Sequence, residues 1–190
     1  MGGVVTACDA FAVSLDFVWQ RGFDSPRDGY HVTPGDSGGG TKGGVIEKTW
    51  RGCVAKGLVA GALATATDAQ LATVLRHECW GAACDGLPAP IAFLLFNGRM
   101  MSGHYPKIFQ ACLGLTGDDD VDGDIGPETL ALVPGAHVPT LMRALVGSHF
   151  AYCRSLAAWP EFHGGWTTRL NAAREFAATL VNPAPAGLPV

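Results

Sequence analysis

The chain has 190 residues, a net charge of −4 and a pI near 5.8, and 48% of its residues are hydrophobic against 16% charged. This length suffices for one full-sized hydrophobic core, and this composition excludes a disordered chain. Because the chain has no basic excess, it lacks the electrostatic footprint of a nucleic-acid-binding protein, and no nucleic-acid partner is expected.

The N-terminus has no secretory signal that we can identify. It lacks a basic segment, and Asp9 and Asp16 interrupt the apolar run that a signal peptide requires. No stretch reaches the roughly 18 uncharged apolar residues of a membrane-spanning helix, so no membrane insertion is expected. We therefore expect the protein to be made in the cytoplasm without a signal peptide.

Six cysteines are many for a cytosolic protein, but they form no CxxC pair and no zinc-type cluster with histidine. Two interpretations stay open: buried thiols, or disulfides formed after export, with Cys79–Cys84 as the local candidate. The acidic run from Asp118 begins like a calcium-binding EF-hand loop, but its twelfth position is Thr129 instead of a glutamate. We expect no metal and no cofactor.

In chain order, the apolar spacing predicts a mainly helical single domain. A first helix over about 6–20 is followed by a polar loop that reaches residue 44. A short apolar piece and a helix or turn then lead to a helix over 66–80, which Thr67 and Gln70 begin with a capping box. The other expected helices are an inner apolar one at 91–101, then 105–115, one begun by Pro127 and Glu128, 138–159 and 166–181.

The glycine-rich stretch RDGYHVTPGDSGGGTKGGV, residues 27–45, is the chemically richest part of the chain. Its GDSGG resembles a serine-protease nucleophile motif, but that family is built from β-barrels and this chain is helical. What remains is a carboxylate after the first helix, a glycine loop and a threonine. A glycosidase needs such groups, because one acid protonates the leaving oxygen and a second polar group positions water or stabilises the cation.

Here the sequence resembles glycoside hydrolase family 108, N-acetylmuramidases that include phage endolysins and secretion activator proteins. The family's first motif reads approximately E-G-G-Y, then D-P-G-G-x-T-x-x-G-[IV]. The matching residues are Gly29, Tyr30, Asp36, Gly38, Gly39, Thr41, Gly44 and Val45. Later family segments also have counterparts in this chain: ECWGAACDGLP, the inner helix, VDGDIGPETLALV, and the group Phe162, Gly165, Trp166 and Arg169. The resemblance therefore covers roughly residues 8–178.

The resemblance implies a lysozyme-like helical fold with a small irregular or β lobe around the glycine loop. It implies a catalytic part at 1–115, a peptidoglycan-binding helical part at 116–180 packed on it as one globule, and a frayed tail at 181–190. The implied activity is that of a muramidase that cleaves the glycan strand of bacterial peptidoglycan.

The family's catalytic glutamate has no direct equivalent in this chain. Aligned without gaps from Asp36 it falls on Arg27, and aligned from the first helix it falls on Gly22. One gap places Asp28 there, which makes Asp28 the first choice for the general acid. The fallback acids are Asp24, Glu47 and Glu78.

Asp36 and Thr41 keep the family's spacing, which implies a second carboxylate and a hydroxyl that position water or substrate. Asp36 has an alternative structural role, because aspartates often hold glycine turns through hydrogen bonds to the backbone. The residues expected to bind substrate are Tyr30, His31, Asn97, Trp166 and Arg169.

Two functions stay open. The first is an endolysin-type hydrolase for phage lysis, which reaches the cell wall or periplasm through a holin or a secretion system. The second is a catalytically impaired wall-binding or lysis and secretion accessory protein on the same scaffold, because the acid position is altered.

Overall fold

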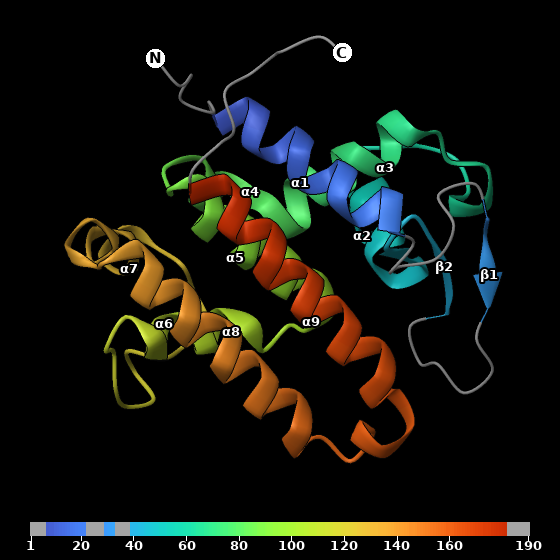
Figure 1. Ribbon diagram of the computed structural model, residues 1–190. Coiled ribbons are helices and arrows are strands. Elements are labelled where there is room, and N and C mark those ends of the chain that lie inside the picture. Colours follow the sequence, from blue (N-terminus) through green and yellow to red (C-terminus); the bar gives the residue numbers. More distant parts are fainter. Residues whose placement is uncertain (1–6, 22–28, 33–38, 182–190) are drawn as a thin grey trace, which may run out of the picture. The chain divides into compact units, whose positions relative to one another are not determined.

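The computed structural model describes residues 7–21, 29–32 and 39–181 (Figure 1). The chain divides into two compact units, one formed by residues 11–81 and the other by residues 1–10 and 82–190. Both units are mainly helical, and the first also holds a small antiparallel sheet, so the expected fold class is confirmed. The expected functional boundary near residue 115 stays a prediction.

The unit of residues 11–81 contains most of the first helix and the whole sheet. Its elements are α1 (Ala7–Arg21, which begins in the other unit), β1 (His31–Val32), β2 (Gly40–Lys42), β3 (Val45–Ile46), α2 (Glu47–Ala55), the 3-10 helix η1 (Leu63–Thr65), α3 (Asp68–Leu75) and the π-helix η2 (Arg76–Trp80). The apolar side of α1 is buried at Leu15, Phe17 and Val18. The predicted first helix is therefore confirmed within a residue at each end.

The β lobe is built around a two-glycine hairpin turn. Gly43 and Gly44 join β2 to β3 with φ angles of 54° and 84°, and this pair of positive angles is the geometry of a type I′ turn. The indole nitrogen of Trp19 donates a hydrogen bond of 3.2 Å to the carbonyl of Gly43, which ties α1 to the turn. The glycine pair thus allows the chain to reverse between β2 and β3, and the Trp19 indole holds this turn against α1.

The helix predicted at 66–80 begins as expected and changes geometry near its end. The side chain of Thr67 accepts a hydrogen bond from the backbone of Gln70, and the Gln70 side chain accepts one from the backbone of Thr67, so the capping box is confirmed. After Leu75 the chain continues as the π-helix η2, which carries Glu78. Single π turns inside helices are frequent at functional sites.

The unit that contains residues 82–190 is a helical assembly around one buried helix. Its elements are α4 (Gly81–Asp85, which starts in the other unit), α5 (Ala89–Met101), α6 (Tyr105–Cys112), α7 (Pro127–Ala131), the 3-10 helix η3 (Val133–Gly135), α8 (Val138–Ser155) and α9 (Trp159–Val181). All residues of α5 from Pro90 to Gly98 are buried, and α6, α8 and α9 all pack against this helix. The predicted inner helix is confirmed.

The last helix is longer than predicted. It begins at Trp159, where the sequence pattern predicted a start at 166. Pro160 is well tolerated in a first helical turn, and Glu161 complements the helix dipole there. Gly164 and Gly165 each cost helical stability of about 1 kcal/mol, but the rings of Phe162 and Trp166 stack with centroids 5.7 Å apart across them. This contact offsets part of that cost.

The cysteines with described side chains are thiols. Cys53, Cys79, Cys84, Cys112 and Cys153 form no disulfide, so the Cys79–Cys84 bridge is not present. Among the helices that the structure describes, none has both the length and the apolar character needed to cross a membrane.

Candidate active site

The sheet places Thr41 at the centre of the β lobe. Thr41 lies opposite His31 of β1 and opposite Ile46 of β3. Because directly opposed residues of antiparallel strands project to the same face, the Thr41 hydroxyl shares a face with the His31 imidazole. Thr41 is half-buried and His31 is exposed, so this face is accessible to a ligand.

Tyr30 lies over the other face of the same sheet. A Cβ atom added to Gly40 would overlap the Tyr30 ring, so the absence of a side chain at Gly40 is what admits the ring. Tyr30 remains 40% exposed. The two residues predicted to bind sugar, Tyr30 and His31, therefore lie next to each other in the chain and on opposite sides of the sheet.

Lys42 holds β2 in place from its far end. Its ammonium donates hydrogen bonds of 3.2 Å and 2.8 Å to the carbonyls of Ala64 and Ala66. This lysine was not predicted as a functional residue, because a lysine in a polar loop has the pattern of an ordinary surface residue. Its role is to position Thr41 through the strand that both residues share.

Glu47, one of the fallback acids, is the described carboxylate closest in sequence to the glycine loop. It begins α2, and its Cβ lies 3.3 Å from the point where Gly39 would carry a Cβ. Gly39 has a φ angle of 78°, a conformation that favours glycine. The Glu47 carboxylate accepts a hydrogen bond of 3.3 Å from Nε of Arg51, four residues further along the helix.

Glu78, the other described fallback acid, is held as a carboxylate. Its Oε1 accepts a hydrogen bond of 2.9 Å from the Lys56 ammonium and lies 3.5 Å from the Cys53 thiol and 3.1 Å from Nδ1 of His77. The hydrogen bond from Lys56 lowers the pKa of Glu78, and burial opposes this shift. A general acid requires the opposite shift, because it must carry a proton near neutral pH.

Three of the predicted carboxylates, Asp24, Asp28 and Asp36, lie outside the described residues. Their catalytic roles stay predictions. In sequence, the described elements that flank them are α1, β1 and β2.

Asn97 and Arg169, predicted to bind substrate, belong to the unit that contains residues 82–190, where they contact each other. Nε of Arg169 donates a hydrogen bond of 3.0 Å to Oδ1 of Asn97. Asn97 is 1% exposed and Arg169 is 5% exposed. This contact links α5 to α9 inside the helical core.

Trp166, the last residue predicted to bind substrate, belongs to an aromatic row on the first half of α9. Its ring lies 5.7 Å from Phe162 and 6.2 Å from Trp159, measured between centroids. Phe162 is 45% exposed and Trp166 is half-buried. Aromatic faces of this kind can stack on sugar rings, and the substrate-binding role of Trp166 stays a prediction.

Comparison with known proteins identifies the segment that contains the β lobe. Residues 28–103 match the glycosyl hydrolase 108 family model. This segment is similar to the glycosyl hydrolase 108 family. The resemblance inferred from the sequence motifs is confirmed. The match supports the prediction that the protein is a glycoside hydrolase.

A solved structure shares the fold over nearly the whole chain. Brucella abortus SagA superposes with a TM-score of 0.76 and 24% sequence identity, covering 92% of this chain and 97% of its own. The expected lysozyme-like, mainly helical fold is therefore confirmed. No curated protein matches the chain.

Proposed function

We propose that the glycosyl hydrolase 108 domain cleaves the glycan strand of bacterial peptidoglycan as an N-acetylmuramidase. Asp28 acts as the general acid that protonates the glycosidic oxygen. Asp36 and Thr41 position the attacking water or stabilise the positive charge that develops on the sugar. The reaction uses acid and base groups of the chain and requires no cofactor.

The observation that carries this proposal is the match of residues 28–103 to the glycosyl hydrolase 108 family model, in which Asp28 is the first matched residue. From there Asp36 follows after eight positions (36 − 28) and Thr41 after five more (41 − 36). Thr41 is fixed by pairing on both sides within the sheet, which supports a positioning role for its hydroxyl.

An aspartate imposes two requirements on this mechanism. Its side chain is one methylene shorter than that of glutamate, so the backbone must approach the glycosidic oxygen more closely. Its pKa must also be raised by burial, because an ordinary aspartate is ionised at neutral pH. A bound glycan supplies such burial when it covers the carboxyl group.

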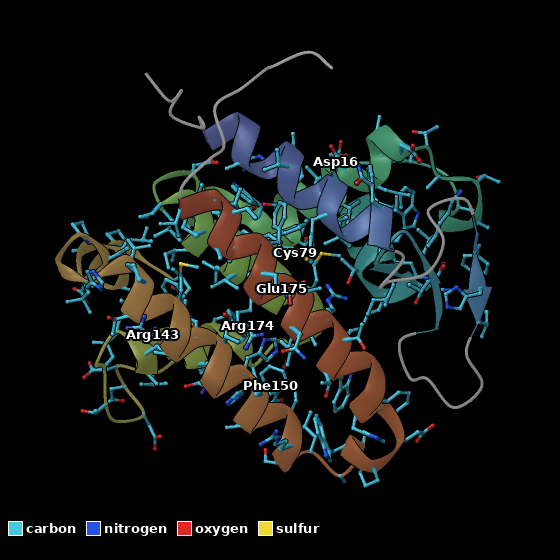
Figure 2. The ribbon with its side chains drawn as sticks, in the orientation of Figure 1. Asp16, Cys79, Arg143, Phe150, Arg174 and Glu175 are labelled. Carbon is cyan, nitrogen blue, oxygen red and sulfur yellow. The ribbon has the colours of Figure 1, made fainter. Side chains whose placement is uncertain are left out.

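Digestion of purified peptidoglycan, with the products identified by mass spectrometry, tests the proposal. Muropeptides with a free reducing N-acetylmuramic acid end are expected. Asp28→Asn is expected to lower the rate by about 100-fold or more, because it removes the proton donor. Asp16→Asn is the matched control, since Asp16 is an exposed aspartate on α1 (Figure 2). Equal rates for Asp28→Asn and the parent protein would refute Asp28 as the acid.

A second candidate function is a wall-binding accessory protein without hydrolytic activity. One observation favours it: of the two described fallback acids, Glu78 has a lowered pKa and Glu47 is bonded to Arg51. Neither is arranged to replace a missing acid. Co-sedimentation with cell walls, without release of reducing sugars, is the result expected of this alternative.

For the biological setting, we propose an endolysin-type role in phage lysis. The protein accumulates in the cytoplasm and reaches the cell wall or periplasm through a holin or a secretion system. Lysis of an expressing culture only when a holin is co-produced supports this route. Lysis without any holin or secretion system counts against it.

A further inference from the structure

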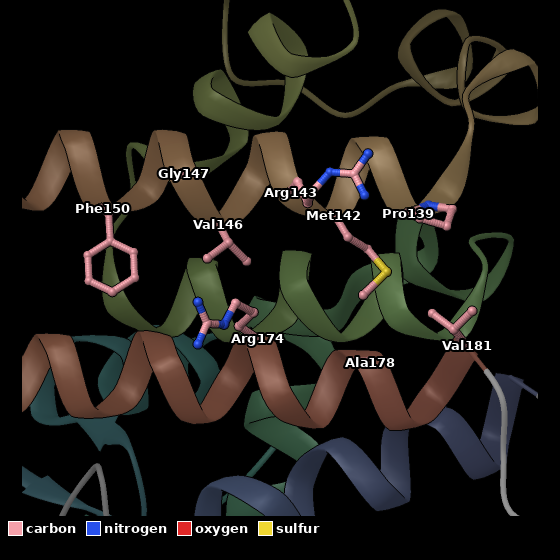
Figure 3. A pocket seen from close by; sticks show the side chains of 9 residues that line it. All are labelled: Pro139, Met142, Arg143, Val146, Gly147, Phe150, Arg174, Ala178 and Val181. Carbon is pink, nitrogen blue, oxygen red and sulfur yellow. The ribbon is translucent and has the colours of Figure 1, made fainter.

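A groove runs between α8 and α9 in the unit that contains residues 82–190 (Figure 3). Its volume is about 570 Å³. Binding sites for small molecules commonly fall in the range of about 300–1,000 Å³. The glycosyl hydrolase 108 segment ends at residue 103, so neither wall of the groove belongs to it.

The walls of the groove are apolar. Met142, Val146 and Phe150 point from α8 toward α9, and Ala178 and Val181 face them from α9 (Figure 3). These three positions of α8 follow a four-residue spacing, which places them on one side of the helix. An extended hydrocarbon chain that lies along the groove would therefore meet apolar side chains on both sides.

Gly147 keeps the groove open on the α8 side. It lines the groove in the middle of the helix, and a Cβ added there would meet no atom within 4 Å. Its φ angle is not positive, so the backbone accepts other residues at this position. A larger side chain at residue 147 would fill the space without displacing a neighbour.

Among the described residues that line the groove, two arginines are the only charged ones. Arg143 lines the groove from α8, and its guanidinium lies beside that helix toward Pro139 (Figure 3), where its Nη2 donates a hydrogen bond of 3.1 Å to Oγ1 of Thr140. Arg174 projects from α9 into the gap between the helices (Figures 2 and 3). In the described part of the chain, Arg174 has no ion pair and no hydrogen bond from its guanidinium.

We propose that this groove binds a single-chain anionic amphiphile. Arg174 pairs with the carboxylate or phosphate of its head, and the hydrocarbon tail lies against Met142 and Val181. The seven helical steps from Arg174 to Val181 span about 10 Å of helix, a length that a chain of about ten carbons covers. Charge complementarity selects an anion, because none of the lining residues that the structure describes carries a carboxylate that would repel it.

Dodecanoate, at concentrations below micelle formation, is the probe for this proposal. Titration calorimetry with the full chain is expected to show saturable binding with one molecule per chain. Decanoate and octanoate are expected to bind successively more weakly, by about threefold for each methylene removed. Dodecanol, which has the same chain without the charge, is expected to bind about tenfold more weakly than dodecanoate.

Two substitutions separate the head site from the tail site. Arg174→Gln is expected to weaken dodecanoate binding about tenfold and to leave dodecanol binding unchanged. Gly147→Leu is expected to abolish binding of both, because its side chain occupies the groove. Replacing glycine within a helix raises helical stability, so an unchanged or higher melting temperature shows that the loss is not due to unfolding.

Arg51→Gln is the matched control, because it removes one arginine charge from an exposed residue of the other unit. Unchanged dodecanoate binding is expected. Equal binding of dodecanol and dodecanoate, or full binding by Gly147→Leu, would overturn the proposal. Binding to phosphatidylglycerol vesicles or to an acidic helical peptide, without binding of monomeric dodecanoate, would also overturn it and assign the groove to that partner. The outcome does not depend on whether the chain hydrolyses peptidoglycan.

Discussion

Arg169 and Asn97 form a buried hydrogen bond of 3.0 Å that joins α9 to α5. Both residues were predicted to bind substrate, but their side chains are almost completely inaccessible. We predict that Asn97→Leu lowers the free energy of unfolding by about 2–4 kcal/mol, because it removes an acceptor from a buried guanidinium. Urea denaturation measures this change. Asn171→Ala, at a half-buried asparagine of α9, is the control and is expected to cost less than about 1 kcal/mol.

The Asn97 prediction separates a structural role from a substrate-binding role. A structural role lowers stability and leaves the KM for peptidoglycan fragments unchanged in the variant that remains folded. A variant with parent stability and a raised KM would show instead that Asn97 contacts the substrate.

His149 makes the stability of the unit that contains residues 82–190 dependent on pH. The side chain is 2% exposed, its ring centroid lies 4.6 Å from that of Tyr105, and its Nε2 has no hydrogen-bond partner in the described part of the chain. Burial lowers its pKa from 6.5 to about 4, and the positive charge of Arg169 acts in the same direction. The folded state therefore disfavours the protonated imidazole.

The sign of the pH effect follows from proton binding. Between pH 6.5 and about 4 the unfolded chain binds a proton at His149 and the folded chain does not, so stability falls as the pH falls. The loss over this window is about 3 kcal/mol. His149→Phe is expected to flatten this part of the curve, and His163→Gln, at an exposed histidine, is expected to preserve it. An unchanged slope in His149→Phe would assign the acid sensitivity to other groups.

Gly40 and Tyr30 are in close contact in the β lobe, because the Tyr30 ring occupies the space that a Cβ atom of residue 40 would need. We predict that Gly40→Ala destabilises the protein by about 1–3 kcal/mol through this overlap. Adding Tyr30→Ala to it is expected to recover part of the loss, which a double-mutant cycle measures as a coupling energy. Gly52→Ala in α2 is the control and is expected to be neutral or stabilising, since its added Cβ meets no atom within 4 Å. Strict additivity in the cycle would mean that the ring does not lie over Gly40.

Helices could be predicted from the sequence where they depend on interactions between residues close together in the chain. The capping box at Thr67 and Gln70 and the apolar run of α5 each act over a few residues, and each appears in the structure. The two-glycine turn at Gly43 and Gly44 was not predicted. The early start of α9 was missed because a Gly-Gly pair normally weakens a helix, and ring stacking between residues 162 and 166 is invisible to propensity rules.

Only part of the candidate site could be predicted from the sequence. Motif spacing located Thr41, and the structure places it at the centre of the sheet. The environment of Glu78 was not predictable, because Lys56 and Cys53 lie 22 and 25 residues away in sequence. Long-range contacts of this kind decide which carboxylate is protonated. Sequence spacing alone therefore left several candidates for the general acid.

Glu78 provides the last test of the site, because its surroundings hold it in the charged form. The hydrogen bond from Lys56 lowers its pKa, so near neutral pH Glu78 has no proton to donate. We predict that Glu78→Gln hydrolyses peptidoglycan at close to the parent rate and with the same pH profile between about pH 5 and 7. Lys56→Met, which removes the donor and leaves the carboxylate, is expected to raise the pKa of Glu78 and also to keep activity. Loss of hydrolysis in Glu78→Gln with the fold intact would instead make Glu78 the acid, and the role proposed for Asp28 would have to be abandoned.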